Sequence, residues 1–270
     1  MSPANPHTPF LPDKVRNYRL LTQKWMRLVR RLPFLKLRFY GEAGGYPLIV
    51  VESEGGTDDV PSLYLSAGIH GDEPAGAGGL IQWAEVSLHL LKGWNIQIFP
   101  CLNPWGLERN IRTDAEGHDL NRCYQSRKVP QIAAQLAAMK GRRYDLAITL
   151  HEDYDARGFY LYEIASQRFH WGESLSESLS ASMSPDSRRL IDSIRAKNGV
   201  IRRKVKKGLL KGDPEAFRLH FHHAKRTFTF ETPSEDFLVR RVEIHRKFLE
   251  ISLNKLQSEY YPRGFSKSIH

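Results

Sequence analysis

The segment LYLSAGIHGDEPAGAGGL, residues 63–80, runs from an apolar strand through a turn that bears His70 and Glu73 and then into a helix. Functional sites in open α/β sheets form where strands end. Glycines on either side of His70 permit the unusual backbone angles that let a His and a carboxylate three residues apart converge on one cation. Such a pair is more often a hydrogen-bonded surface pair, so a metal site at this turn requires a third ligand.

A second apolar run, YDLAITLHEDYD at residues 144–155, ends at His151. Two His nitrogens and one Glu carboxylate form a ligand set of catalytic zinc, which keeps a position open for water, whereas structural zinc is usually closed by four protein ligands. His151 is therefore the candidate third ligand beside His70 and Glu73. The acids that could orient the His rings are Asp145, Glu152 and Asp153, and the sequence alone does not choose among them.

Between these strands lies NPWGLERNIRTDAEGHDLNRCY, residues 103–124, which is too polar and irregular to form core. A loop of this composition beside a metal is typical of substrate recognition. The planar guanidinium of arginine binds a carboxylate through two hydrogen bonds and stays charged at any working pH. The arginines of this region are Arg109, Arg112, Arg122 and Arg127. Their spacing does not rank them, and a loop of solvated ion pairs is the alternative interpretation.

A late β-rich stretch, RTFTFETPSEDF at residues 226–237, places Glu231 at its end, before Thr232 and Pro233. An ionised acid that is buried without a partner costs on the order of several kcal/mol. A metal-bound water would be a suitable partner for Glu231. The alternative is that Glu231 points to solvent, and the sequence leaves both interpretations open.

Short β-rich runs alternate with helical segments along the chain, which is the pattern of a sheet flanked by helices. The predicted strands are 47–52, 62–67, 96–102, 145–150, 159–164 and 227–231. The predicted helices are 73–91, 130–139, 185–196 and 237–260. No repeat or clear linker interrupts them, so we expect a single α/β domain. Residues 199–223 are expected to form an insertion or loop on the side of the site.

The N-terminal region is strongly basic. Residues 14–40 contain nine Lys or Arg and no acid. The apolar residues at helical spacing are Leu20, Leu21, Trp25, Leu28, Val29 and Leu32. This pattern predicts a basic amphipathic helix, packed on the domain with its charged face in water. The alternative is a surface that docks on anionic lipid or nucleic acid. We expect residues 1–40 to form this extension and residues 41–262 the main domain.

Composition excludes several classes of protein. The chain has 270 residues, of which 41% are hydrophobic and 26% charged, as in ordinary globular proteins. Its two cysteines exclude a disulfide framework and a zinc site of four thiolates. The net charge of +10 favours acidic partners without identifying one. No apolar run approaches the roughly 20 residues of a transmembrane helix and no secretory signal is evident, so we expect a cytoplasmic protein.

Taken in order, these segments resemble the zinc carboxypeptidase family (carboxypeptidase A-like), near its branch of succinylglutamate desuccinylases and aspartoacylases. The family pattern is His-x-x-Glu, then an Arg followed nine residues later by Asn-Arg, then a His, then a Glu at the end of a late strand. The matching residues are His70 and Glu73 in HGDE, Arg112, Asn121 and Arg122 in RTDAEGHDLNR, His151 in TLHED and Glu231 in FTFETP. The resemblance covers about residues 47–235 and implies a mixed central β-sheet flanked by helices.

The resemblance also implies roles. The implied ligands of one Zn²⁺ are His70, Glu73 and His151. Glu231 would be the general base that takes a proton from water and passes it to the leaving amine. Arg112 would face the oxyanion of the reacting carbonyl, and Asn121 and Arg122 would hold the terminal carboxylate of the substrate.

One feature of carboxypeptidases is missing from the expected place. They carry a tyrosine some twenty residues before the catalytic Glu, yet no Tyr occurs between Tyr162 and Tyr260. The three histidines that could replace it, more simply read as a surface cluster, are His220, His222 and His223.

Three functions follow as hypotheses. The first is a cytoplasmic, zinc-dependent metallocarboxypeptidase or amidase that hydrolyses an amide bond next to a free carboxylate in a small peptide. The second is an N-acyl amino acid deacylase, which the HGDE turn resembles, although the spacing of nine residues with Gly117 inside it favours the peptidase. The third is a catalytically inert basic protein that binds nucleic acid or a membrane surface. Because every expected site position is filled, we expect a peptide or acyl amino acid as partner and no nucleic acid, with peripheral membrane contact left open.

Overall fold

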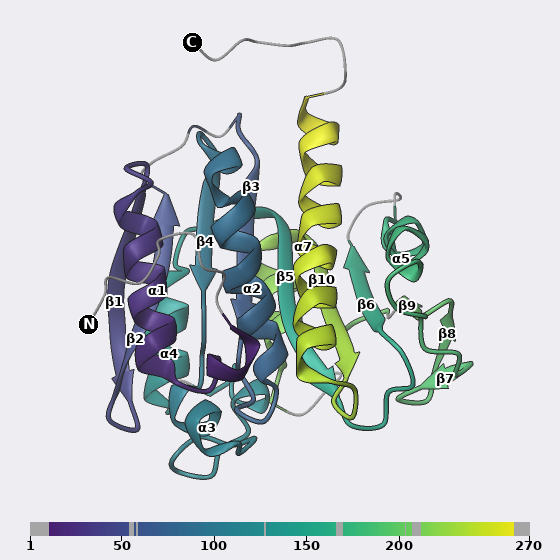
Figure 1. Ribbon diagram of the computed structural model, residues 1–270, viewed down its shortest axis with the longest axis horizontal. Coiled ribbons are helices and arrows are strands. Elements are labelled where there is room, and N and C mark those ends of the chain that lie inside the picture. Colours follow the sequence, from purple (N-terminus) through teal and green to yellow (C-terminus); the bar gives the residue numbers. More distant parts are fainter. Residues whose placement is uncertain are drawn as a thin grey trace.

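Four neighbouring strands run parallel at the centre of the sheet in the computed structural model (Figure 1). They are β4 (Asn95–Phe99), β3 (Ser62–Ala67), β5 (Tyr144–Asp153) and β10 (Ala224–Pro233). The outer strands are β1 (Leu35–Ala43), β2 (Tyr46–Ser53), β6 (Tyr160–Ala165), β7 (Leu190–Ile191), β8 (Ile194–Lys197) and β9 (Val200–Arg202). The order across the sheet is β1-β2-β4-β3-β5-β10-β6-β9-β8-β7. Since β2 and β6 pair antiparallel with this central group, the sheet is mixed, as predicted.

The structure describes residues 11–53, 57, 59–126, 128–165, 170–202, 204–206 and 212–261. The helices within these ranges are α1 (Tyr18–Arg30), α2 (Pro74–Ser87), α3 (Pro104–Arg109), α4 (Pro130–Ala138), α5 (Gly172–Ser180), α6 (Glu215–His222) and α7 (Leu238–Tyr260). Short 3-10 helices occur at Pro12–Lys14, Leu88–Leu91 and Leu120–Arg122. In Figure 1, α1, α2 and α7 cross the front face of the sheet.

Both faces of the central strands are buried, which explains the mostly apolar sequences of β3 and β5. Successive residues of a strand point to opposite faces. Leu63 and Leu65 of β3 pack in the larger core with side chains of α1, α2 and α7. Tyr64 lies between them in sequence and packs in a second core with Ile132 of α4 and Leu219 of α6. The helices therefore form two layers around the sheet in a single domain.

Helices α2 and α7 approach closely because α2 presents glycine at the contact. A Cβ built on Gly79 would lie 2.4 Å from the Cβ of His245 in α7. Any side chain at Gly79 would separate the helices. This close packing holds the first half of α7 beside α2 on the same face of the sheet (Figure 1).

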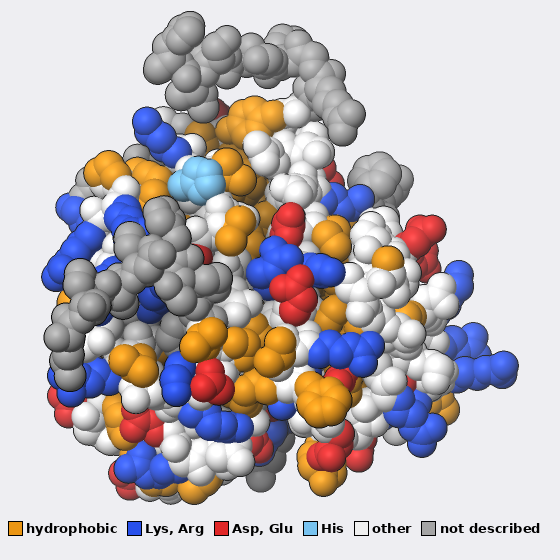
Figure 2. Space-filling view, in the orientation of Figure 1, with side chains coloured by type: hydrophobic (Ala, Val, Ile, Leu, Met, Phe, Trp, Pro, Cys, Tyr) orange, Lys and Arg blue, Asp and Glu red, His pale blue; other side chains and the backbone are white. Residues whose placement is uncertain are grey.

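The predicted helix over residues 14–40 is correct only in its first half. Helix α1 ends at Arg30, and residues 35–43 form β1, which pairs antiparallel with β2. Pro33 cannot continue a helix, and the following LKLRFY alternates apolar and charged side chains with the period of a strand. The apolar face of α1 is buried, with Trp25 fully enclosed, while Lys and Arg side chains are spread over the same face of the molecule (Figure 2). The division of the chain at residue 40 stays a prediction.

The predicted helix over residues 185–196 is wrong. This segment forms β7 and β8, which continue into β9 as a three-stranded antiparallel meander. Residues 198 and 199 form the second two-residue turn, an Asn-Gly pair with φ of 51° and 68°. Asn-Gly is the preferred sequence of a type I′ hairpin turn, and this signal outweighs the helical spacing of the apolar residues.

The other predicted helices and strands coincide with α2, α4, α7, β2, β3, β4, β5, β6 and β10 within a few residues. Helices α3, α5 and α6 were not predicted, and residues 199–223, expected to form an insertion or loop, contain β9 and α6. No helix in the described part of the chain combines the length and apolar character needed to cross a membrane.

Candidate metal and substrate site

Parallel strands bring the predicted site residues to one edge of the sheet. His70 lies in the turn that follows β3, His151 lies near the end of β5, and Glu231 lies near the end of β10. His151 and Glu231 are register partners across the β5–β10 pair. Three segments that are far apart in the sequence therefore meet because the carboxyl ends of their strands are neighbours.

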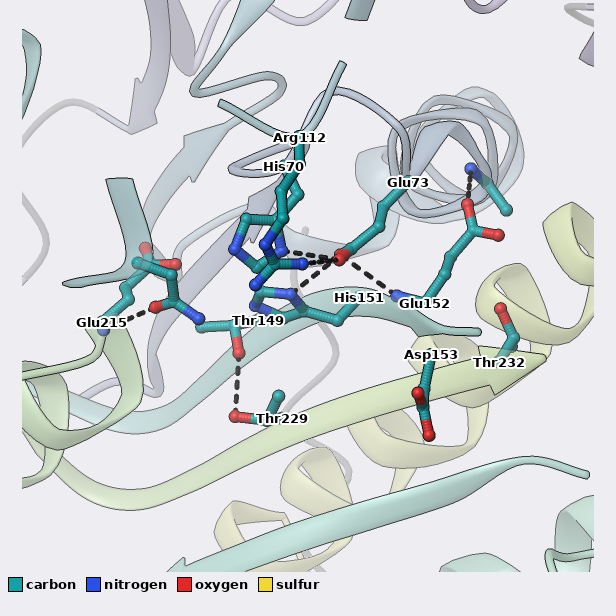
Figure 3. A network of polar contacts seen from close by, with 12 residues as sticks. His70, Glu73, Arg112, Thr149, His151, Glu152, Asp153, Glu215, Thr229 and Thr232 are labelled. Carbon is teal, nitrogen blue, oxygen red and sulfur yellow. Dashed lines mark hydrogen bonds and ion pairs between the residues drawn. The ribbon is translucent and has the colours of Figure 1, made fainter. Parts of the chain in front are cut away.

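His70, Glu73 and His151 form a buried cluster whose ligand atoms lie within 4.8 Å of one another. Nδ1 of His70 lies 2.6 Å from Oε1 of Glu73, and Nδ1 of His151 lies 2.9 Å from Oε2. Figure 3 shows both imidazoles and the side chain of Arg112 converging on this carboxylate. Two nitrogens and one carboxylate oxygen are the donor set of an open zinc site, so the three side chains could hold one metal ion.

Glu73 is free to serve the cluster because a neighbouring acid takes over its local role. Glu73 is the N-cap residue of α2, yet its side chain does not cap the helix. Oε1 of Glu152 instead accepts the hydrogen bond from the N–H of Ala75, at 2.6 Å. The N–H of Glu152 also donates to Oε2 of Glu73, at 3.1 Å. Glu152 thus satisfies the helix start and orients the carboxylate toward the His rings.

The charges of the cluster keep the Glu73 carboxylate ionised and a proton on His70. Burial alone would raise the pKa of Glu73, but the neighbouring His70 and His151 lower it to about 2. Burial alone would lower the pKa of His70, but Glu73 and Asp119 raise it to about 9. Glu73 therefore stays ionised, and an incoming metal has to displace only the proton of the imidazole.

Asp119 completes the surroundings of the cluster. Its Oδ1 lies 3.2 Å from Nε2 of His70, on the side of the ring away from Glu73. Arg112 donates to Oδ2 of Asp119 at 3.2 Å and to Oε1 of Glu73 at 3.3 Å. A carboxylate behind a ligating His fixes its tautomer and ring orientation. Asp119 was not among the predicted site residues, although its place in DLNR, two residues before Asn121, was a usable signal.

Glu231 is half-buried and lines the same cavity as Glu73 and Arg112. Burial and the Glu73 carboxylate raise its pKa well above the ordinary value, with Asp153 and Asp192 adding to the effect and Arg112 opposing it. An acid with a raised pKa beside a set of candidate metal ligands is suited to carry a proton during a reaction.

Asn121 and Arg122 line the same cavity. Oδ1 of Asn121 accepts a hydrogen bond from the backbone N–H of Glu215 at 2.9 Å. The side-chain NH₂ group of Asn121 is therefore the group that can donate to a substrate. The buried Glu215 carboxylate is in turn held by Tyr64 and by Nε2 of Gln135 at 3.0 Å. The first turn of α6 and the Asn121 loop are thereby fixed to the core of the sheet.

The cavity has a volume of about 230 Å³. It extends from the His70–Glu73–His151 cluster along β5 and β10, toward the starts of these strands. Its first row of residues, across three adjacent strands, is His151, Glu231 and Tyr160, and its second row is Thr149, Thr229 and Tyr162. Phe217 of α6 and Asp192 of the β7–β8 turn also line the cavity.

Several predicted residues lie elsewhere. Asp145 sits at the opposite end of β5, where it accepts from the N–H of Ser62 at 2.8 Å. Arg109 stacks on Trp105, with its guanidinium 4.6 Å from the ring centroid, and Arg127 lies outside the described residues. The residues that line the cavity do not include His220, His222 or His223; the tyrosines that do are Tyr160 and Tyr162 of β6.

Asp153 lines the cavity but is engaged there. Its Oδ2 accepts from the hydroxyl of Tyr160 at 3.0 Å and pairs with Arg188 at 3.2 Å. Of the three acids considered as supports for the His rings, Glu152 is the one in contact with the cluster, through its backbone N–H.

Comparison with known proteins agrees with this geometry. Residues 59–190 match the model of the succinylglutamate desuccinylase/aspartoacylase catalytic domain. This segment includes the three candidate metal ligands and the Arg112–Arg122 loop. No curated protein matches the chain.

Solved structures share the fold. A protein of Shewanella amazonensis assigned as a metallopeptidase superposes with a TM-score of 0.78 at 23% identity, over 90% of this chain and 94% of that one. A second, from Shewanella denitrificans, gives 0.77 at 21% identity over 97% and 100%. A metallo-carboxypeptidase of Pseudomonas aeruginosa, in complex with (2-guanidinoethylmercapto)succinic acid, gives 0.59 at 19% identity over 87% and 69%. The matched segment and the shared fold together support a carboxypeptidase-like family near the succinylglutamate desuccinylase/aspartoacylase branch, which confirms the resemblance drawn from the sequence motifs.

Proposed function

We propose that the protein is a zinc-dependent metallocarboxypeptidase or amidase that hydrolyses an amide bond next to a free carboxylate in a small peptide. One observation carries the proposal: a single cavity contains the buried His70–Glu73–His151 cluster, the acid Glu231 and the donors of the Arg112–Arg122 loop. A set of ligands for one metal ion, a group that carries a proton, and groups that bind a carboxylate are the three requirements of this reaction.

The donor set fits zinc. His70 and His151 offer imidazole nitrogens and Glu73 a carboxylate oxygen, all buried and mutually within reach. A zinc ion held there supplies a Lewis acid that polarises a carbonyl and lowers the pKa of water to about 7. The contribution of the chain is to fix these ligands, through Glu152 and Asp119, before a metal arrives.

The other residues act on the substrate and on protons. Glu231 accepts a proton from the attacking water and donates it to the leaving amine, which its raised pKa favours. Arg112 faces the oxyanion that develops on the carbonyl, and removal of one such donor typically costs about 10² to 10³ in rate. Asn121 and Arg122 hold the free carboxylate of the substrate and so select the terminal bond.

A second candidate is deacylation of an N-acyl amino acid. The match of residues 59–190 to the succinylglutamate desuccinylase/aspartoacylase catalytic domain favours it. The two reactions share the metal, the proton carrier and the residues that bind the carboxylate. They differ on the acyl side of the amide bond, which is a peptide in the first reaction and a simple acyl group in the second. A cytoplasmic location is part of our proposal for either reaction.

Hydrolysis by the zinc-loaded protein across three substrate sets distinguishes these functions. The sets are short peptides, the same peptides with a blocked C-terminus, and N-acyl amino acids. Release of the C-terminal residue, abolished by blocking and by Glu231→Gln, supports the carboxypeptidase. Cleavage of the N-acyl amino acids alone supports the deacylase. Inactivity on all three sets, with stoichiometric zinc bound, contradicts both and leaves the inert binding protein.

A further inference from the structure

The cavity does not end at the metal cluster. Below the row that contains His151 and Glu231, the row of Thr149, Thr229 and Tyr162 forms a polar floor, in which the hydroxyls of the two threonines are 3.1 Å apart. At about 3.3 Å of rise per strand residue, the two rows are separated by roughly 7 Å. This slot is long enough for a side chain with a stem of three or four carbons.

The two ends of the slot differ in charge. On the side of the Asn121 loop, the cavity is lined by the guanidinium groups of Arg112 and Arg122. On the side of β6, it is lined by Asp153 and Asp192. Asp153 is already paired with Arg188, at 3.2 Å. For Asp192, the contact recorded among the described residues is the hydroxyl of Tyr162, at 2.5 Å. Asp192 therefore brings a carboxylate to the slot without a cation of the described chain to neutralise it.

The position of Asp192 in the chain is unusual. It is the single acid among residues 187–212, a segment that contains ten Lys or Arg. It occupies the first position of the two-residue β7–β8 turn, where its φ of 48° and that of Ser193, 60°, lie in the left-handed region. Asp192, Arg189 and Arg195 of this hairpin are all exposed, and Asp192 is the one of the three that lines the cavity.

We propose that the slot binds a substrate side chain that ends in an ammonium group, so that the residue released by the enzyme is a diamino acid such as lysine or ornithine. An ammonium group has three donors and no acceptor. The slot offers it the Asp192 carboxylate and the hydroxyl oxygens of Tyr162 and Thr229, while Asn121 and Arg122 take the α-carboxylate of the same residue. The inference rests on the proposed function, because it assigns a specificity to that active site.

The basic surface around the hairpin does not oppose this assignment. Exposed charges farther than a Debye length, about 8 Å at physiological salt, are largely screened. The carboxylate that contacts the substrate side chain decides which side chain the slot prefers. The exposed lysines and arginines affect the rate at which the substrate approaches the site.

Lysine and norleucine test the proposal because they have side chains of similar length and differ in the terminal charge. The substrates are N-blocked dipeptides that end in either residue, and the readout is the ratio of the two kcat/KM values. We expect a ratio above about 10 for the zinc-loaded protein and a fall of at least about tenfold in this ratio for Asp192→Asn. Asparagine tolerates the left-handed conformation of the turn, so this variant preserves the hairpin.

Asp155→Asn is the matched control, since Asp155 is an exposed acid in the β5–β6 loop and does not line the cavity; its ratio should equal that of the unmodified protein. A ratio near one in the unmodified protein, or a ratio unchanged in Asp192→Asn, would overturn the inference while the carboxypeptidase stands. N-acyl-lysine and N-acyl-norleucine form the second pair. A preference for N-acyl-lysine that depends on Asp192, with no dipeptide cleaved, removes the peptidase and supports the ammonium slot.

Calorimetry covers the case in which neither pair is cleaved. Free lysine and norleucine are titrated into the zinc-loaded protein. Tighter binding of lysine that disappears in Asp192→Asn supports the slot without any activity, and equal binding of the two amino acids contradicts it.

Discussion

Glu152 and Arg241 form an ion pair inside the protein, between the end of β5 and the start of α7. The Glu152 side chain is completely enclosed and the Arg241 side chain is 11% exposed. The same carboxylate accepts from the first turn of α2, at Ala75. One acid next to His151 therefore joins two helices behind the metal cluster and leaves Glu73 free to face the His rings.

Loss of Arg241 should be strongly destabilising. Arg241→Met leaves the Glu152 carboxylate buried without its partner, and breaking a buried pair typically costs about 3 to 5 kcal/mol. Urea denaturation monitored by circular dichroism measures the change in the free energy of unfolding. Arg240→Met is the control, because Arg240 is 55% exposed and its pair with Asp236 is on the surface; its effect should stay within about 1 kcal/mol. Equal changes in the free energy of unfolding for the two variants would show that the buried pair stabilises the fold no more than the surface pair does.

Replacement of Glu231 should separate catalysis from metal binding. Glu231→Gln keeps the shape of the side chain but cannot accept a proton, so we expect kcat to fall by about 10² to 10⁴. Zinc content, measured by atomic absorption, should not change, since Glu231 is not one of the three clustered ligands. Glu235→Gln, an exposed acid four residues later, should retain full activity. Retention of kcat in Glu231→Gln would remove Glu231 from the mechanism.

Asp119 should control zinc affinity without ligating the metal. Asp119→Asn weakens the hydrogen bond to Nε2 of His70, which lies 3.2 Å away. Changes of this kind typically lower metal affinity 10- to 100-fold, whereas His70→Ala should abolish stoichiometric binding. Competition with a chromophoric chelator measures both. An affinity of Asp119→Asn equal to that of the unmodified protein would show that the His70 ring is held without Asp119.

His245 should make the metal-free protein less stable in mild acid. It is fully buried behind the cluster, where burial and the neighbouring Arg241 lower its pKa to about 3. In the unfolded chain its pKa is about 6.5. Below pH 6.5 the unfolded chain binds a proton that the folded protein does not, so the free energy of unfolding falls as the pH drops toward 3. This group alone contributes a loss of about 2 kcal/mol between pH 7 and pH 5.

The contribution of His245 is isolated by difference. Urea denaturation at both pH values, with a chelator present, is compared between the unmodified protein and His245→Gln. Other titrating groups cancel in this comparison, and the pH dependence should be weaker in the variant by that amount. Parallel pH curves for the two proteins would show that His245 is protonated in the folded state.

The sequence predicted the elements whose signal is local. Strands β3 and β5 are mostly apolar because both of their faces are covered, and β10 alternates Thr and Phe. The ends of these three strands mark the positions of His70, His151 and Glu231. The helix at 185–196 failed because turn chemistry at Asn198-Gly199 outweighed apolar spacing. Strand β1 was missed because its alternation follows directly on a helix in a uniformly basic segment.

What the sequence by itself determined is the set of chemical groups and their order: two histidines and a glutamate for a metal, a late glutamate, and an Arg-Asn-Arg loop. A linear order does not reveal which side chains are neighbours, and the parallel register of β5 and β10 decided that His151 and Glu231 stand side by side. Only the tertiary structure showed Glu152 capping α2 in place of Glu73, Asp119 behind His70, and Asp192 facing the slot. These contacts join elements distant in the chain, and their energies depend on burial and separation, which the folded structure alone defines.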